Sequence, residues 1–236
     1  MSYPDLENRV SIVTGASSGI GYRTAQRLAE EGAKVVAVAR SGEPLEELAK
    51  GFPDHIFPCA GDLSDDSFID KIFDKTDREL GPCDVLVNNA GAVVVKTITK
   101  MTSKEWDDIF AVNLRAVYLA SRRAVRSMQD NKGGSIINVA SISGVHGSSK
   151  FPGTTAYAAS KGAVISFTEA LAAEVKGRGV RVNAVSPGSV DTPMLFAANP
   201  MAKPDMTPDE IANVILFLAS NLSRPINGQN LHVFSA

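Results

Sequence analysis

Residues 9–21 read RVSIVTGASSGIG, and this stretch decides the fold that the rest of the sequence supports. Its first part, Arg9–Thr14, is an apolar and β-branched run that favours a buried strand. A turn with three glycines follows at once, and a helical pattern near 19–31 comes directly after it. The order strand, glycine turn, helix is typical of the first unit of a nucleotide-binding α/β sheet.

The glycine turn is suited to hold a phosphate. Gly15 allows a tight turn, while Gly19 and Gly21 remove side chains where the backbone must approach a ligand or the sheet. The helix that follows offers unpaired N–H groups and a partial positive charge to a pyrophosphate. An ordinary structural turn is the alternative. The dinucleotide interpretation predicts a cradle of Gly15, Ser17, Ser18, Gly19, Ile20 and Gly21.

The alternation of strand and helix continues along the chain. Short apolar runs predict seven strands, at Arg9–Thr14, Lys34–Ala39, His55–Cys59, Val85–Asn88, Ser135–Val139, Arg181–Val185 and Leu231–Phe234. Amphipathic stretches predict helices near 19–31, 43–50, 65–80, 104–130, 155–176 and 208–220. Continuously apolar strands separated by helices form parallel sheets covered on both faces. We therefore predict the α/β class: one Rossmann-type domain over residues 1–236, with a doubly wound, seven-stranded parallel sheet.

Composition excludes several classes of protein. The 236 residues carry a net charge of −2, which leaves no basic footprint for nucleic acid. The N-terminus has no signal-peptide pattern, and no run approaches the roughly 18 apolar residues of a membrane-spanning helix. The two cysteines and three histidines show no metal-ligand spacing. We expect a cytoplasmic protein with reduced thiols, no metal site, and neither nucleic acid nor membrane as a partner.

The end of the second predicted strand bears on the choice of cofactor. An NAD site places a carboxylate here to accept from the ribose 2′-OH, and Ala39 cannot do so. Arg40, followed by Ser41, instead offers a planar guanidinium suited to a 2′-phosphate. The sequence therefore predicts NADP(H) in preference to NAD(H), with an ordinary solvated arginine as the alternative.

Residues 157–161 read YAASK and carry the second motif. On a helix this spacing places Tyr157 and Lys161 on one face, a turn apart. A free tyrosine has a pKa near 10, and a nearby lysine cation stabilises the phenolate and lowers that pKa. The pair can then pass a proton to or from a carbonyl or alcohol oxygen. We therefore expect the pKa of Tyr157 to be lowered.

Together these motifs resemble those of the short-chain dehydrogenase/reductase family, and the resemblance covers nearly the whole chain. It also includes Asp62-Leu63, Asn88-Asn89-Ala90-Gly91, Asn113, Ser141, and Pro187-Gly188 with Thr192, most of them just after a predicted strand. Any one of these is common by chance, whereas their joint order is specific. The resemblance implies further cofactor contacts from Asp62 and Leu63 at the adenine, from Asn89, Ala90 and Gly91, from Pro187 and Gly188, from Val190 and Thr192 at the nicotinamide carboxamide, and from Tyr157 and Lys161.

The resemblance also implies a catalytic set of Asn113, Ser141, Tyr157 and Lys161. In this set Tyr157 exchanges the proton and Ser141 hydrogen-bonds the substrate oxygen. Lys161 holds the nicotinamide ribose and tunes Tyr157, and Asn113 holds a water that relays protons to Lys161.

Two serines compete for one of these roles. The stretch ASISG at residues 140–144 matches the family pattern with Ser141, and Ser143 is the fallback. Ser141 precedes Tyr157 by sixteen residues, about three more than in many relatives. The excess falls in Ser148–Thr155, a loop that we expect to border the substrate.

The resemblance predicts an NADP(H)-dependent oxidoreductase that moves a hydride between nicotinamide and a carbonyl or secondary alcohol, with carbonyl reduction as the expected direction. A 3-oxoacyl thioester on acyl carrier protein is one candidate substrate. Lys132 keeps a basic docking charge for that carrier, whereas Ala173 stands where relatives often have arginine. A broader carbonyl reductase and a non-catalytic nucleotide-sensing scaffold are the alternatives.

Two further expectations concern shape and assembly. The irregular segment 189–206 carries three prolines and several apolar residues, which makes it a candidate substrate lid, with an irregular surface connection as the alternative. The family resemblance implies a homotetramer or homodimer built on the helices near 104–130 and 155–176. Within the first of these, the expected packing positions are Ala111, Leu114, Val117, Tyr118 and Ala120.

Overall fold

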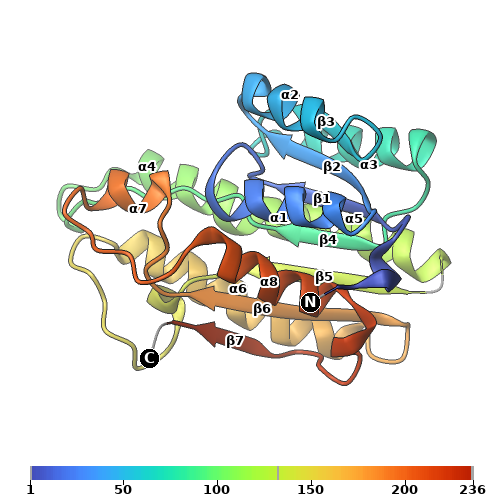
Figure 1. The fold of residues 1–236 in the computed structure, drawn as a ribbon. Helices are drawn as coiled ribbons and strands as arrows, with labels where there is room; N and C mark the ends of the chain where they lie inside the picture. The colour runs from blue at the N-terminus through green and yellow to red at the C-terminus, as the bar shows by residue number, and fades with distance from the viewer. Residues whose placement is uncertain (1, 132, 235–236) are drawn as a thin grey trace.

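The computed structural model describes residues 2–131 and 133–234, and its centre is one parallel sheet of seven strands. The strands lie in the order β3-β2-β1-β4-β5-β6-β7 (Figure 1). Their bounds are β1 Val10–Thr14, β2 Lys34–Ala39, β3 Ile56–Ala60, β4 Val85–Asn88, β5 Gly134–Val139, β6 Val180–Pro187 and β7 Asn230–Val233. All neighbouring strands pair in parallel, so the predicted sheet is confirmed.

Helices cover both faces of this sheet. Their bounds are α1 Gly19–Glu30, α2 Gly42–Gly51, α3 Asp66–Glu79, α4 Ser103–Phe110, α5 Ala116–Asp130, α6 Thr155–Glu174, α7 Pro193–Ala198 and α8 Pro208–Ala219. In Figure 1, α1 and α8 lie in front of the sheet, and α3, α5 and α6 lie behind it. This is the doubly wound, single-domain Rossmann arrangement that the alternation of strands and helices predicts.

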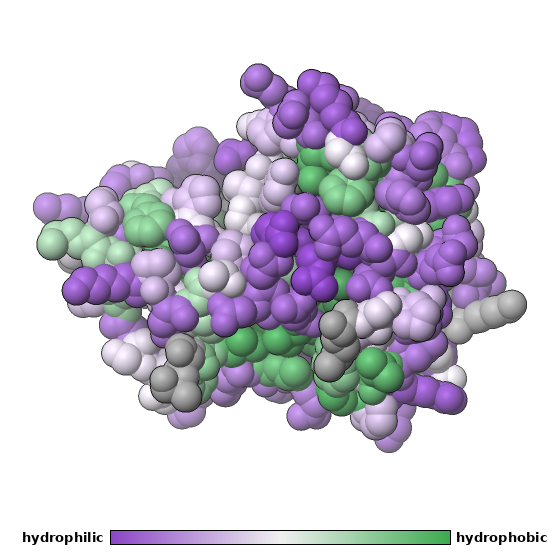
Figure 2. Space-filling view, viewed as in Figure 1, coloured by the Kyte–Doolittle hydropathy of each residue, from purple (hydrophilic) through white to green (hydrophobic). Residues whose placement is uncertain are grey.

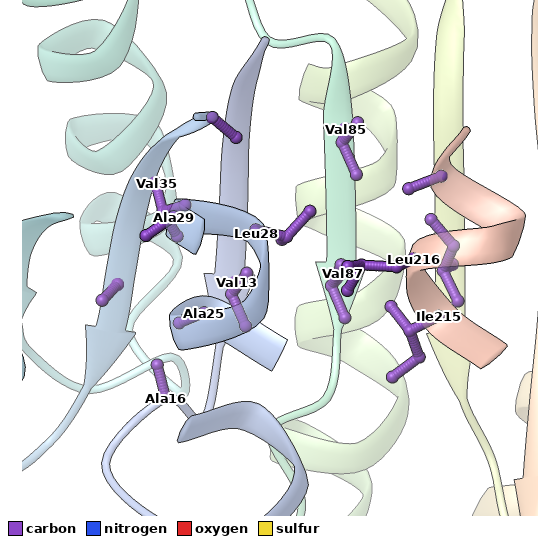
Figure 3. Close-up of a cluster of buried hydrophobic side chains, with 14 of the residues drawn as sticks. Val13, Ala16, Ala25, Leu28, Ala29, Val35, Val85, Val87, Ile215 and Leu216 are labelled. Carbon is purple, nitrogen blue, oxygen red and sulfur yellow. The ribbon is translucent and has the colours of Figure 1, made fainter. Parts of the chain in front are cut away.

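The hydrophobic core lies in two layers, one on each face of the sheet. In the front layer, Leu28 of α1 and Leu216 of α8 pack against Val13 and Val87 of the central strands (Figure 3). The rear layer holds side chains of α3 and α5 against the opposite face of the same strands. Each fully buried leucine or isoleucine contributes about 1.5–3 kcal/mol. Burial on both faces explains why the strands are continuous apolar runs in the sequence.

The helical stretch predicted near 104–130 is confirmed, but it is not α-helical throughout. α4 ends at Phe110, the five residues Ala111–Arg115 form a π-helix, and α5 begins at Ala116. A π turn inserts an extra residue into the helical ladder and often occurs at a functional site. Here it contains Asn113, whose side chain is fully buried and hydrogen-bonded outside its own helix. Those tertiary hydrogen bonds are not visible in helical periodicity.

The expected packing positions on this helix are corrected in two cases. Val117 and Ala120 are buried within the single chain, so they are not free to pack against another subunit. Tyr118 is exposed, with the Arg122 guanidinium 5.5 Å from its ring centroid. Lys132, the expected docking charge, lies outside the described residues. Within the described ranges, no helix has both the length and the apolar character needed to cross a membrane.

Candidate active site

The carboxyl ends of six strands lie around one cavity of about 600 Å³. It opens where β1 and β4 diverge, since the chain winds outward from those two strands in opposite directions. Most of the predicted site residues line this cavity: Gly15, Ser17, Ser18, Gly19, Ile20, Arg40, Asp62, Leu63, Asn89, Ala90, Gly91, Ser141, Tyr157, Lys161, Pro187, Gly188, Val190 and Thr192. The fold therefore brings residues that are far apart in the sequence to one edge of the sheet.

The glycine turn is tightly held against the loop after β4. Gly15 has a φ of +68°, which disfavours any residue with a side chain. A Cβ on Gly21 would lie 2.3 Å from the Gly15 carbonyl oxygen and 2.3 Å from Nδ2 of Asn89. That Asn89 amide donates to the carbonyls of Thr14 and Gly15 at 2.9 and 3.2 Å. Asn89 thus supports the shape of the turn from behind.

Two residues expected in the cofactor site are not part of the cavity wall. Gly21 is buried behind Gly15 and serves the close packing just described. Ser41 is exposed and occupies the N-cap position of α2. Gly21 therefore supports the shape of the glycine turn but does not line the cavity. Arg40 lines the cavity, and Ser41 does not.

A cation and an anion face the cavity at the ends of β2 and β3. Arg40 is exposed and follows β2, and Asp62 lies two residues after β3. The Ser64 backbone N–H donates to Oδ1 of Asp62 at 2.9 Å, and this turn is the main reason why the pKa of Asp62 is lowered. Arg40 adds a smaller favourable charge interaction. The Asp62 carboxyl is therefore ionised at neutral pH, and Arg40 lines the same cavity.

Lys161 is the most deeply buried charge in the site. Its side chain comes from α6, and the residue is only 4% exposed. Nζ donates to the backbone carbonyl of Val139, at the end of β5, at 2.7 Å. Burial lowers the pKa of Lys161 to about 8. An ammonium in this position is costly to the fold, which is typical of a functional lysine.

The expected lowering of the Tyr157 pKa is not found. The surrounding protein raises the pKa of Tyr157, and a hydrogen bond with the Ser141 side chain opposes that effect only in part. The Lys161 ammonium lies 5.9 Å from the ring centroid and is engaged by the Val139 carbonyl instead. Desolvation of the phenolate therefore outweighs the lysine charge. Tyr157 is a neutral phenol at neutral pH.

The geometry favours Ser141 over Ser143 as the partner of the phenol. Ser141 is the residue whose side chain hydrogen-bonds Tyr157. Its Oγ also accepts from the Ser143 backbone N–H at 3.2 Å, which fixes its orientation at the start of the short 3-10 turn Ile142–Gly144. Ser143 lines the same cavity, so it remains available as a second hydroxyl.

Asn113 lies behind the cavity rather than on its wall. Its Oδ1 accepts from the Ala92 N–H at 2.7 Å, and its Nδ2 donates to the Ala92 carbonyl at 2.9 Å. Nδ2 also donates to Oγ of Ser160 at 3.0 Å, and that hydroxyl donates to the Tyr157 carbonyl at 2.8 Å. The π-helix, the loop after β4 and the catalytic turn of α6 are thereby joined through one side chain.

The candidate lid 189–206 is more regular than its composition indicates. α7 begins after Thr192, whose side chain accepts from the Leu195 N–H. The two ends of the segment are tied together, since Val190 and Met206 form a β-bridge and Asp191 donates to the Met206 carbonyl at 2.9 Å. The Thr192 methyl would lie 2.9 Å from a Cβ on Gly19. The segment therefore rests directly on the glycine turn.

Sequence reasoning missed part of the wall and its support. The missed wall residues include Ala39, Gly61, Ala92, Val93 and Val112, whereas the loop and the segment expected to border the substrate do contribute Phe151, Thr154, Met194, Leu195, Asn199, Ala202 and Lys203. Thr14 and Ser160 were missed among the supporting hydrogen bonds. The position of Thr14 at the end of β1 and of Ser160 inside the YAASK motif were the available signals. Within residues 2–131 and 133–234, no cluster of metal-ligating side chains is present.

A parallel sheet of this order, with a glycine turn at its switch point and a tyrosine beside a buried lysine nearby, defines a dinucleotide-binding enzyme fold. The family model of the short chain dehydrogenases matches residues 9–203. The chain belongs to this family and is an oxidoreductase that acts on CH–OH groups.

Curated relatives match over almost the entire chain. The 3-oxoacyl-(acyl-carrier-protein) reductase FabG of Thermotoga maritima is 39% identical over an alignment of 237 positions, gaps included, that covers 95% of each chain. The protein of the same name from Escherichia coli is 35% identical, with 97% of each chain covered.

Solved structures agree with the fold. A 3-ketoacyl-(acyl-carrier-protein) reductase from Brucella melitensis, complexed with NADH, matches with a TM-score of 0.90 and 34% identity over 97% of each chain. A short-chain type dehydrogenase/reductase from Mycobacterium marinum matches with a TM-score of 0.91 and 32% identity, covering 98% of this chain and 96% of that one.

Proposed function

We propose that this protein reduces a carbonyl compound to an alcohol with NADPH. One observation carries the proposal: a neutral Tyr157, its partner Ser141 and the buried Lys161 line the same cavity as the glycine turn. A dinucleotide held at that turn can therefore reach the three groups along one continuous wall. The residues fit such a cofactor, because the turn has no space for side chains and presents the start of α1.

The chain's own residues handle the oxygen of the substrate. A reduced nicotinamide, when bound, supplies the hydride that the carbonyl carbon receives. The raised pKa of Tyr157 keeps its proton in place until negative charge develops on the carbonyl oxygen. Ser141 then holds that oxygen by a second hydrogen bond, and Tyr157 transfers its proton to it. A phenol that stays protonated supports the direction of reduction.

Lys161 and Asn113 have positioning and electrostatic roles in this proposal. The Lys161 ammonium stabilises the phenolate that remains after proton transfer. Asn113 fixes the loop after β4 against α6 through Ala92 and Ser160. The water relay that the family resemblance assigns to Asn113 stays a prediction.

The preference for NADPH over NADH rests on Arg40. This guanidinium lies on the cavity wall where a 2′-phosphate would extend from the adenosine ribose, and β2 ends without a carboxylate. The first experiment is a side-by-side titration with NADPH and NADH, followed by nicotinamide fluorescence. We expect tighter binding of NADPH, with a loss of roughly tenfold or more in Arg40→Ala and little change for NADH. Arg78→Ala, a similarly exposed arginine on α3, is the control.

Equal affinities of the unaltered protein for the two cofactors would contradict the preference. Binding of neither would overturn the enzyme proposal as a whole. A solved relative that is complexed with NADH makes the NADH arm of the titration informative.

A 3-oxoacyl thioester is the particular substrate that the names of the relatives favour. The test compares reduction of an acetoacetyl group on acyl carrier protein, on a small thiol, and of an unrelated ketone. A kcat/KM at least tenfold higher for the carrier-bound group supports a carrier-protein reductase. Equal values support a broad carbonyl reductase.

We further propose that the protein acts in the cytoplasm as a homotetramer or homodimer. Cys59 and Cys83 are both free thiols, as a reducing compartment requires. Tyr118 leaves part of α5 exposed and available to a second subunit. Light scattering at micromolar concentration tests the assembly, and a monomeric mass would contradict it.

A further inference from the structure

The end of the cavity beyond Tyr157 is bordered by two apolar walls. One wall is the loop 145–154, which contributes Phe151, and the other is the segment 189–206, which contributes Met194. Phe151 is 52% exposed and Met194 38% exposed, although both line the cavity. Large apolar groups at a cavity mouth often mark the place where a ligand is bound.

The Phe151 wall is held in a defined position relative to Tyr157. The Phe151 carbonyl accepts from the backbone N–H and from Oγ1 of Thr154, and Thr154 is the residue that precedes α6. Gly153, with a φ of +85°, accepts from the Lys96 backbone N–H at 2.9 Å. These bonds tie the loop both to the segment after β4 and to the first turn of α6. A substrate held at the Tyr157 hydroxyl therefore meets Phe151 at a fixed place.

Met194 reaches the part of the cavity beside Gly91 and Lys161. Its Cε lies 3.7 Å from the position of a Cβ on Gly91, where Lys161 Nζ is 3.6 Å from the same point. The Met194 side chain thus extends from α7 to the catalytic end. Because α7 is anchored by the Val190–Met206 bridge, this wall is also built into the fold.

Outside the cavity, each wall continues as exposed apolar surface. Val95 lies next to Gly153 of the Phe151 loop, and Phe196 and Met201 belong to the same segment as Met194, with Met201 88% exposed. Figure 2 shows hydrophobic residues exposed among hydrophilic ones at the left end of the molecule, where α7 lies. An apolar chain that leaves the cavity between the two walls would cover part of this surface. A compact polar substrate would leave it in water.

We propose that Phe151, which shares the cavity wall with Met194, determines substrate specificity and selects carbonyl compounds with one extended apolar substituent. The substituent lies along the Phe151 ring while the carbonyl oxygen meets Tyr157 and Ser141. This inference rests on the proposed function, because it takes the Tyr157 hydroxyl as the site of reduction.

The test measures kcat/KM with NADPH for ethyl acetoacetate and for ethyl 3-oxodecanoate. The unaltered protein prefers the longer chain. Phe151→Ala lowers kcat/KM for the long substrate by roughly tenfold and changes the short one less than about twofold, since apolar contacts discriminate by this order. Leu222→Ala, an equally exposed apolar residue near the end of α8, leaves the preference unchanged.

A binding measurement separates this inference from the proposed function. Calorimetric titration of NADPH-loaded Tyr157→Phe with decan-2-one and butan-2-one measures chain recognition without turnover. Tighter binding of decan-2-one that is lost on adding Phe151→Ala supports the inference, even if every ester is left unreduced. A Phe151→Ala variant that loses activity equally on both esters, or keeps the full chain preference, overturns it.

Discussion

The carboxyl edge and the amino edge of the sheet differ in how their polar and charged groups are paired. At the carboxyl edge, glycines, a buried lysine and a neutral tyrosine border an open cavity. At the amino edge, charges are paired and satisfied. Asp84 accepts from the Val10 N–H at 2.9 Å and forms an ion pair with Arg9. Arg181 donates to Oγ of Ser223 at 2.9 Å and to the carbonyls of Leu218 and Ser220 at 2.8 and 3.1 Å.

The difference separates function from stability. The Arg181 guanidinium lies at the C-terminal end of α8, where cations stabilise the unpaired carbonyls of a helix. Burial lowers the pKa of both cations, but Arg181 donates to several oxygen atoms, whereas Lys161 at the other edge meets a single carbonyl. The contacts at the amino edge thus raise the free energy of unfolding. The buried lysine at the carboxyl edge lowers it, because that edge holds reactive groups. Variants at the two edges should therefore have opposite signatures.

The largest expected effect comes from Tyr157→Phe. Loss of the proton donor should lower kcat by at least roughly a thousandfold, whereas the apolar ring is preserved. Thermal unfolding should change little, because the packed ring is kept and only the hydrogen bond with the Ser141 side chain is lost. Steady-state kinetics, together with NADPH binding as a control for cofactor affinity, checks this. Residual activity above a few per cent would show that another group donates the proton.

Gly21→Ala tests whether the carboxyl edge tolerates any added atom. A methyl group 2.3 Å from the Gly15 carbonyl must displace the turn, so NADPH affinity should fall by roughly tenfold or more, with a loss of about 2 kcal/mol in unfolding free energy. Gly51→Ala is the matched control, because a Cβ there meets nothing within 4 Å. That control should be neutral or stabilising by about 0.5–1 kcal/mol. Equal behaviour of the two variants would remove the argument for close packing.

The Lys161→Met variant tests the carboxyl edge through the pH dependence of the free energy of unfolding. Because the folded pKa of about 8 lies below the ordinary 10.5, the charged lysine costs about 3 kcal/mol below pH 8. The cost falls as the pH rises from 8 toward 10.5, with about 2 kcal/mol recovered by pH 9.5. Denaturant unfolding should therefore give a stability difference between the two proteins that shrinks from pH 7 to pH 9.5. A difference independent of pH would mean that Lys161 titrates normally.

Arg181→Ala should show the reverse signature at the amino edge. Loss of the hydrogen bonds from its guanidinium should lower the unfolding free energy by about 2 kcal/mol. kcat and NADPH affinity should stay within about twofold, since the site lies at the other end of the strands. Arg224→Ala, an exposed arginine beyond Ser223, is the control and should change stability by less than about 0.5 kcal/mol. A loss of activity in folded Arg181→Ala would break the separation between the edges.

The sequence predicts most of the fold because its local signals agree with the tertiary structure. The apolar strands and the glycine turn are fixed by burial on both faces and by close backbone approach, and both leave a pattern in the residues. The π-helix around Asn113 could not be predicted, because its cause is a set of hydrogen bonds to Ala92 and Ser160. The pKa of Tyr157 was predicted in the wrong direction, since the sequence gives the spacing to Lys161 but not the burial or the competing Val139 carbonyl.

Site residues that directly follow a strand were predictable from the sequence. Site residues in irregular segments were hard to predict. Ser141 and Arg40 are placed by the strands before them, and the structure finds both on the cavity wall. Phe151 and Met194 come from irregular segments whose folding depends on Gly153, Lys96 and the Val190–Met206 bridge. Such contacts have no period in the sequence.

The Val190–Met206 bridge has a consequence for how this enzyme can change. The bridge joins the two ends of the segment. The residues between Val190 and Met206, here called the cassette, can therefore change in length and composition without altering the sheet. Loop-closure entropy rises only slowly with length, so insertions there cost little. The glycine turn and the Tyr157 pair lie outside the cassette. Grafting a different segment between Pro193 and Met206, which keeps Thr192 against the glycine turn, should therefore exchange one substrate range for another and leave the glycine turn, Thr192 and the Tyr157 pair in place.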